Sequence, residues 1–133
     1  MTPISIVRLG GVLAICLTAI GSASTAGAAT PSQRACFSLH QLQSTRPDGD
    51  QRVYFRVGLH DVYRLDLAFR CSALRDQEGI VLLPAGGQDL ICTPLDLDLR
   101  ARQLGGGSTA CMIKSITRLT PEEAAALPPK VRP

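Results

Sequence analysis

Strict alternation of apolar and polar residues marks two neighbouring segments of the chain. Their apolar sides consist of Val53, Phe55, Val57 and Leu59 in the first segment and Tyr63, Leu65, Leu67 and Phe69 in the second. A period of two is the repeat of a strand with one buried face. The short gap between the segments predicts a hairpin. Apolar residues must face apolar residues across it, which favours a register with Gly58 opposite Val62 and Phe55 opposite Leu65.

The opposite side of this predicted hairpin gathers Arg52, Tyr54, Arg56, Arg64 and Asp66. The same register sets Arg56 opposite Arg64 and Tyr54 opposite Asp66. Guanidinium groups bind carboxylates and phosphates in pairs of hydrogen bonds, so an aromatic ring among arginines suits a small anionic ligand or a partner protein. The alternative is an ordinary solvated sheet face, or one covered by a C-terminal helix.

Short β-prone runs separated by turn formers occupy most of the remaining chain. Further strands are predicted over residues 36–42, 80–83, 89–93, 95–100 and 111–119. Imperfect alternation in the last of these predicts a bulge. Residues 44–50 are dense in turn formers and predict a loop, and residues 71–78 predict an irregular segment or one helical turn.

The end of the chain carries a helix signal. Thr120 is a good N-cap, Pro121 suits the first helical position, and Glu123 completes a capping box. The fold class expected is therefore mainly β: a small antiparallel barrel or sandwich of five to seven strands with one short C-terminal helix.

The first residues predict a secretory signal peptide. Arg8 precedes an apolar run and a stretch of small residues, which is the order of such a signal. The cleavage site is expected after Ala28, with Ala29 as the runner-up, and the apolar run is too short to span a bilayer. Cys16 follows a sequence like a lipobox, but Ile15 stands where a small residue is needed. The expected segments are a signal peptide (1–28), a polar leader (29–35), a disulfide-stabilised β domain (36–127) and a tail (128–133).

Four cysteines remain after removal of the signal: Cys36, Cys71, Cys92 and Cys111. An even number in a small exported chain predicts two disulfides. Closeness in sequence favours Cys71–Cys92, which leaves Cys36–Cys111. The runner-up pairs Cys36 with Cys71 and Cys92 with Cys111. A metal site is the alternative use of the cysteines, but their spacing contains no Cys-x-x-Cys pair.

Charge and catalytic signals narrow the possible functions. The chain has a formal net charge of +3, and loss of Arg8 lowers it further, which is too little to indicate nucleic acid or a membrane surface. His40 and His60 have no nucleophile motif around Ser38 or Ser108. Asp96 and Asp98 share one side of a predicted strand and suit a cation or a sugar, but such a pair is far more often just the polar face of an amphipathic strand. No metal or other cofactor is expected.

Several short motifs resemble a family of small exported proteobacterial proteins classed as a domain of unknown function. They are Cys36-Phe37, Val53-Tyr54, Tyr63-Arg64-Leu65, Cys71 with Leu74, Ile91-Cys92, Cys111 with Ser115-Ile116, and Arg118-Leu119-Thr120-Pro121-Glu122-Glu123. The family commonly follows its third cysteine with a small residue, a glycine and an acid, whereas Thr93-Pro94-Leu95 stands here. The resemblance implies a location in the bacterial envelope and supplies no activity.

These observations favour an exported, non-catalytic envelope protein in the periplasm or outside the cell. It is expected to bind an envelope protein or a small anionic ligand through the face with Arg52, Tyr54, Arg56, Arg64 and Asp66. The alternative is a small secreted hydrolase or an enzyme inhibitor. A cleft with convergent polar groups would favour the hydrolase.

Overall fold

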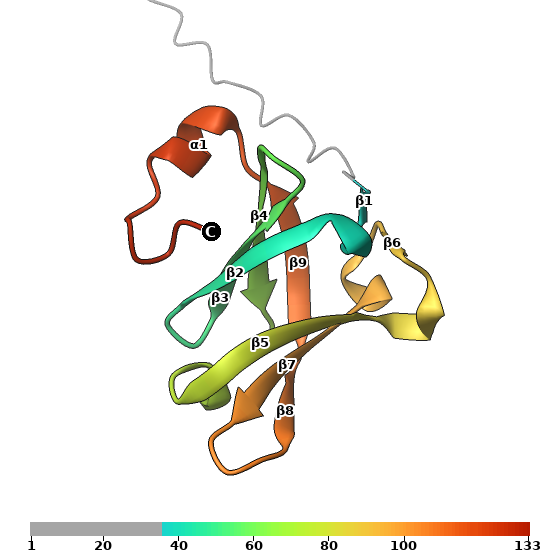
Figure 1. Ribbon diagram of the computed structural model, residues 1–133, viewed down its shortest axis with the longest axis vertical. Coiled ribbons are helices and arrows are strands. Elements are labelled where there is room, and N and C mark those ends of the chain that lie inside the picture. The colour runs from blue at the N-terminus through green and yellow to red at the C-terminus, as the bar shows by residue number, and fades with distance from the viewer. Residues whose placement is uncertain (1–35) are drawn as a thin grey trace, which may run out of the picture.

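The computed structural model describes residues 36–133. The predicted signal peptide (1–28) and polar leader (29–35) lie outside the described residues. Half of the described residues lie in antiparallel strands, and one short helix lies near the C-terminus, which confirms the predicted mainly β fold class (Figure 1). The sheets form a sandwich-like arrangement and do not close into a barrel.

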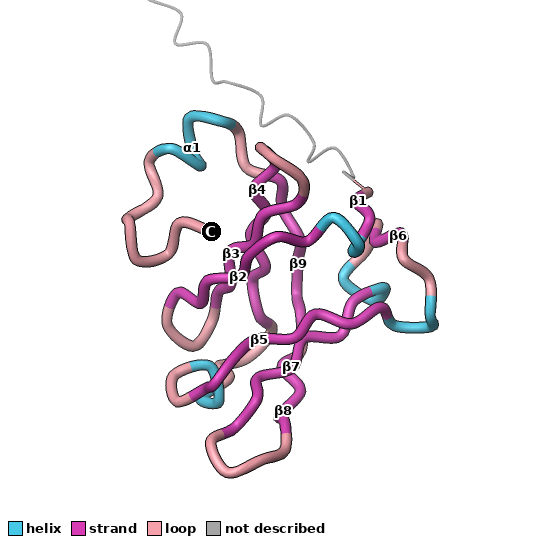
Figure 2. The backbone as a smooth tube through the Cα atoms, viewed as in Figure 1, coloured by secondary structure: helices cyan, strands magenta, loops and turns pink. Residues whose placement is uncertain are grey.

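The described residues contain nine strands and one α-helix, and short 3₁₀ turns join several of them (Figure 2). Their bounds are β1 (Phe37–Ser38), β2 (Leu42–Asp48), β3 (Arg52–Val57), β4 (Asp61–Leu67), β5 (Gln77–Pro84), β6 (Leu90–Ile91), β7 (Leu97–Gln103), β8 (Ser108–Cys111), β9 (Ile113–Arg118) and α1 (Pro121–Ala125). A four-stranded sheet has the order β2-β3-β4-β9, a three-stranded sheet has the order β5-β7-β8, and β1 pairs with β6.

The hairpin of β3 and β4 has the predicted faces but not the predicted register. Phe55 lies opposite Tyr63 rather than Leu65, and Val57 lies opposite Asp61. Gly58, whose φ of 60° is left-handed, begins a connection over residues 58–60 that is as long as the predicted one but lies one residue earlier. A shift of two residues leaves every side chain on its predicted side, because the side-chain repeat of a strand is two.

Strand β2 corrects the expectation that residues 44–50 form a loop. Its residues pair with β3 from Leu42 to Asp48, and the turn begins only at Gly49. Pro47 is tolerated because β2 is an edge strand, so its missing N–H removes no ladder hydrogen bond from a second neighbour. Pairing with β3 thus outweighs the local preference of these residues for a turn.

The main hydrophobic core is built from side chains of all three sheets. Its most completely buried large side chains come from both larger sheets and from β6, and they are Val53, Phe55, Leu65, Ile91 and Leu99. The ring of Phe37 packs against those of Phe55 and Tyr63, with centroid distances of 5.2 and 4.7 Å. Two residues from the apolar sides of the alternating segments lie outside the core: Phe69 follows the end of β4 and is 71% exposed, and Leu59 is exposed in the hairpin loop.

The two disulfides join Cys36 to Cys92 and Cys71 to Cys111. Both the favoured pairing and the runner-up are therefore wrong. The pairing of β1 with β6 places Phe37 opposite Ile91, so Cys36 and Cys92 form the next cross-strand pair, with Cα atoms 4.2 Å apart. After β4, the Ala68 N–H donates to the Met112 carbonyl, which brings the chain beside β8 and explains the second bond.

The C-terminal half confirms two further predictions. The interrupted alternation near residue 112 marks the passage from β8 to β9, and a register irregularity follows between Asp66 and Leu67 on the partner strand. Helix α1 begins after the Thr120 N-cap, whose side chain accepts from the Glu123 N–H while the Glu123 carboxylate accepts from the Thr120 N–H. Both halves of the predicted capping box are thus formed.

Candidate functional site

The structure brings the five predicted site residues onto one face of the four-stranded sheet. They alternate with the buried residues of β3 and β4, so they point away from the core. The observed register sets Arg52 opposite Asp66 and Tyr54 opposite Arg64, whereas Arg56 lies opposite Val62. We call this surface the arginine face. Two like charges that were expected to be direct neighbours, Arg56 and Arg64, are therefore offset along the sheet.

Strand β2 adds two residues to the arginine face that the sequence analysis missed. Arg46 lies opposite Tyr54, and Ser44 lies opposite Arg56. One row across the sheet therefore reads Arg46, Tyr54, Arg64, with Thr117 of β9 at its end. The only sequence signal for Arg46 was the weak alternation within residues 44–48, which the turn formers there obscured.

The C-terminal segment covers part of the arginine face. Tyr54 is only 6% exposed, because it packs in a small cluster with Val62 and Leu127. Val131 also packs against this cluster, and the Arg132 guanidinium donates to the carbonyls of Ala125 and Leu127. The expectation of an open tyrosine ring is therefore wrong, and the covered alternative describes this half of the face.

Two of the arginines already have carboxylate partners. Arg52 lies 3.3 Å from Asp48, and the Arg64 Nε donates to Asp66 at 3.0 Å. The Ser115 hydroxyl also donates to the Asp66 carboxylate, at 3.2 Å. These pairs orient the side chains and cancel their charge, so Arg52 and Arg64 are less available to a ligand than the sequence suggested.

Arg46 and Arg56 are the arginines of this face without an ion pair to any described residue. Arg46 is exposed, and Arg56 is half-buried. The Arg56 Nε and the Ser44 hydroxyl are both buried without a hydrogen-bond partner among residues 36–133. Buried donors normally have partners, so this cross-strand pair is the part of the face best suited to receive an acceptor from water or a ligand.

Ser38 and His40 do not form a nucleophile–base pair. The Ser38 hydroxyl donates to the Asp89 carboxylate, and the same carboxylate accepts from the His40 main-chain N–H at 2.9 Å. The His40 imidazole lies 3.5 Å from Asp89 and is largely exposed. A serine hydrolase needs the imidazole between the hydroxyl and the carboxylate, whereas here the carboxylate lies between the other two.

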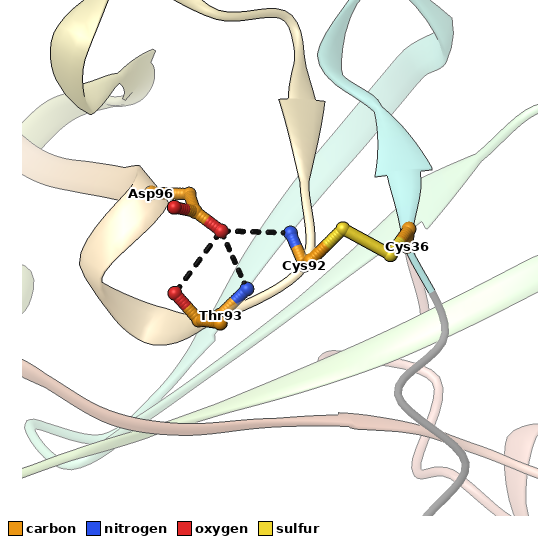
Figure 3. Close-up of a disulfide and its surroundings, with 4 residues drawn as sticks. All are labelled: Cys36, Cys92, Thr93 and Asp96. Atoms are coloured by element: carbon orange, nitrogen blue, oxygen red, sulfur yellow. Dashed lines mark hydrogen bonds between the residues drawn. A yellow bond between two sulfur atoms is a disulfide. The ribbon is translucent and has the colours of Figure 1, made fainter.

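Asp96 and Asp98 also have separate roles instead of forming a shared site. The Asp96 carboxylate accepts from the N–H groups of Cys92 and Thr93 and from the Thr93 hydroxyl, and these bonds lower its pKa (Figure 3). Asp98 instead pairs with Arg100 at 2.7 Å. Asp96 therefore fixes the chain directly after the Cys36–Cys92 disulfide.

The described residues show neither a cluster of metal ligands nor a helix that could span a membrane. Residues 36–133 contain no group of three or more histidine, cysteine or acidic side chains placed to hold a metal ion. No helix in the same part of the chain is long and apolar enough to cross a membrane. The two disulfides indicate an oxidising compartment outside the cytoplasm.

Comparison with known proteins identifies a family for this chain but no similar individual protein. No curated protein and no solved structure shows significant similarity to it. A family model does match residues 5–132, which is nearly the whole sequence. The chain therefore belongs to the family of unknown function DUF6491.

Proposed function

We propose that this protein is exported to the bacterial envelope and binds, without catalysis, an anionic group at the arginine face. The group is a carboxylate or phosphate, carried by a small molecule or by the surface of an envelope protein. The predicted signal peptide and the two disulfides support the location.

One observation carries the binding proposal: the buried, unpartnered donors of Arg56 and Ser44 lie side by side, next to the unpaired guanidinium of Arg46. An oxyanion satisfies such donors and gains charge-assisted hydrogen bonds. Arg52 and Arg64 lie on the same face, where their ion pairs with Asp48 and Asp66 hold the two guanidinium groups in position.

The hydrolase alternative has less support. Its best candidates, Ser38 and His40, are both hydrogen-bonded to Asp89 in an order that does not activate the hydroxyl. An inhibitor would bind its target enzyme through a surface, so it remains a special case of partner binding.

The test is a titration of the exported protein with inorganic phosphate and, separately, with a peptide of four aspartates, followed by amide chemical shifts. We expect shifts centred on Ser44, Arg46 and Arg56. Arg46→Gln should weaken binding about twofold to fivefold, the effect of one exposed ion pair. Phosphate-only binding would indicate a small ligand, and peptide-only binding an acidic protein surface.

The matched control is Arg102→Gln, which removes an exposed arginine from the three-stranded sheet. Binding that weakens equally in this control would show that net charge, not the arginine face, is responsible. The absence of shifts at Ser44, Arg46 and Arg56 with both probes would refute the proposal.

A further inference from the structure

A groove of about 260 Å³ lies beside strand β8, away from the arginine face. One wall is β8 with Met112, and the other is the segment that follows β4. The Cys71–Cys111 disulfide joins the two walls. Phe69 and Met112, which line the groove, are 71% and 67% exposed. Two large exposed apolar side chains at one site favour contact with another molecule.

Strand β8 presents an unpaired main-chain edge at this groove. It is the last strand of the three-stranded sheet and pairs only with β7. The Gln103 N–H donates to the Gly107 carbonyl, which makes these residues a hydrogen-bonded pair. Such pairs alternate with non-bonded ones along an antiparallel ladder, so the main-chain groups of Ser108 and Ala110 point away from β7. Within residues 36–133 they have no main-chain partner outside the ladder.

The β8 edge also lacks the features that normally prevent strand addition. Natural edge strands are protected by charged side chains, proline or bulges. Strand β8 contains none of the first two, since its residues are Ser108, Thr109, Ala110 and Cys111. The edge strand β2, by contrast, contains Arg46 and Pro47. The open edge of β8 is therefore suited to pairing with an extended peptide.

Charge indicates what kind of peptide fits. Arg70 is the one charged residue among those lining the groove, and it has no ion pair to any described residue. A carboxylate on the bound peptide complements this guanidinium. A second copy of the chain offers no such carboxylate. Two-fold pairing of β8 about Thr109 sets the Cys111 end against the turn 105–107 of the other copy, and that turn consists of glycines.

We propose that the groove binds an extended segment of a partner protein that adds a strand to β8. The segment carries an apolar side chain against Phe69 and Met112 and an acidic side chain against Arg70. The main-chain groups of Ser108 and Ala110 supply the hydrogen bonds of the new ladder. This site is independent of the arginine face and of its ligand.

The probe is an acetylated, amidated octapeptide of alternating valine and threonine with one central glutamate, titrated into the oxidised mature protein. We expect amide shifts at Ser108 and Ala110 and slower hydrogen exchange of their N–H groups. Replacing the peptide glutamate by glutamine, or Arg70→Gln in the protein, should weaken binding about twofold to fivefold. Arg46→Gln should leave this binding unchanged.

Two substitutions of one residue test the strand addition itself. Ala110→Pro removes an N–H that points away from β7, so the existing ladder is kept while the outward donor is lost. Ala110→Val keeps that donor and is the matched control. We expect the proline variant to lose peptide binding at least tenfold and the valine variant to bind normally, with both showing the thermal unfolding of the parent protein.

Peptide binding that survives Ala110→Pro in the folded protein would overturn the proposal. So would tighter binding of a peptide with lysine in place of the glutamate, or amide shifts confined to another surface. A dimer that forms through β8 and excludes the peptide, detected by sedimentation of the parent and proline variants, would show that the occupant is a second copy instead.

Discussion

Removal of each disulfide in turn separates two contributions to the free energy of unfolding: the loop-closure entropy of the bond and the burial of its cysteines. The variants are Cys36→Ala with Cys92→Ala, and Cys71→Ala with Cys111→Ala. The first bond closes a sequence separation of 56 residues and the second a separation of 40. By loop-closure entropy each bond is worth about 4 kcal/mol, and the larger loop gains only about 0.3 kcal/mol more.

Burial reverses this small difference. Cys111 is 5% exposed and belongs to the main core, with Cys71 packed against it, whereas Cys36 is exposed. Replacing the buried sulfurs leaves unfilled space in the core, which costs about 1 kcal/mol beyond the entropy. The Cys71/Cys111 variant should therefore be less stable than the Cys36/Cys92 variant by about 0.7 kcal/mol, the burial cost less the loop-closure difference.

The assay is urea unfolding of the parent and both variants at 25 °C, followed by far-ultraviolet circular dichroism. The unfolding slopes must be similar for the free energies to be compared. An equal or greater loss in the Cys36/Cys92 variant would refute the reasoning from burial. A loss below 1 kcal/mol in both variants would refute the loop-closure estimate as well.

Three other expectations follow from the structure, and a fourth follows from the sequence. Phe55→Ala, at a fully buried position, should lower the free energy of unfolding by about 3–5 kcal/mol in urea titrations, and a loss below 1 kcal/mol would contradict its burial. Leu127→Ala should release the C-terminal segment from Tyr54, detected as faster proteolysis after residue 119 with the core amides still protected from exchange. Because hydrogen bonds lower the folded-state pKa of Asp96, the parent should exceed Asp96→Asn in stability at neutral pH. The difference should shrink as the pH falls below the ordinary aspartate pKa of 3.8 and should be lost as the pH falls through the lower folded-state pKa; a difference that does not change with pH would contradict this. Intact mass of the exported protein should give a first residue at Ala29 or Thr30, and retained residues 1–28 or a lipid on Cys16 would contradict the signal peptide.

Patterns that repeat along a strand were sufficient to predict the central hairpin. The alternation around Phe55 and Leu65 fixed which side chains face the main core, because the side-chain repeat permits only two choices. It did not fix the register, since a shift of two residues satisfies the same pattern. The structure shows the register directly: the connection begins at Gly58 instead of Leu59, and Val57 pairs with Asp61.

Features that depend on distant pairing were not predictable from local pattern. Strands β1 and β6 are two residues long, too short for any periodicity, yet their pairing determines the partner of Cys36. Strand β2 was hidden by turn-forming residues, and with it Arg46 and Ser44 of the arginine face. The capping box located helix α1, and the sequence allowed a C-terminal cover over the arginine face, but no local pattern decided that the segment after α1 packs on Tyr54.

The order of the two disulfides along the chain has a consequence for survival among proteases. The bonds interleave, because Cys71 lies inside the first loop and Cys111 lies beyond it. A single cut anywhere between Cys36 and Cys111 therefore leaves two pieces that are still covalently joined. The exposed turn 105–107 is a natural place for such a cut. A molecule nicked there keeps β8 tied to Cys71 and migrates as one band until its disulfides are reduced.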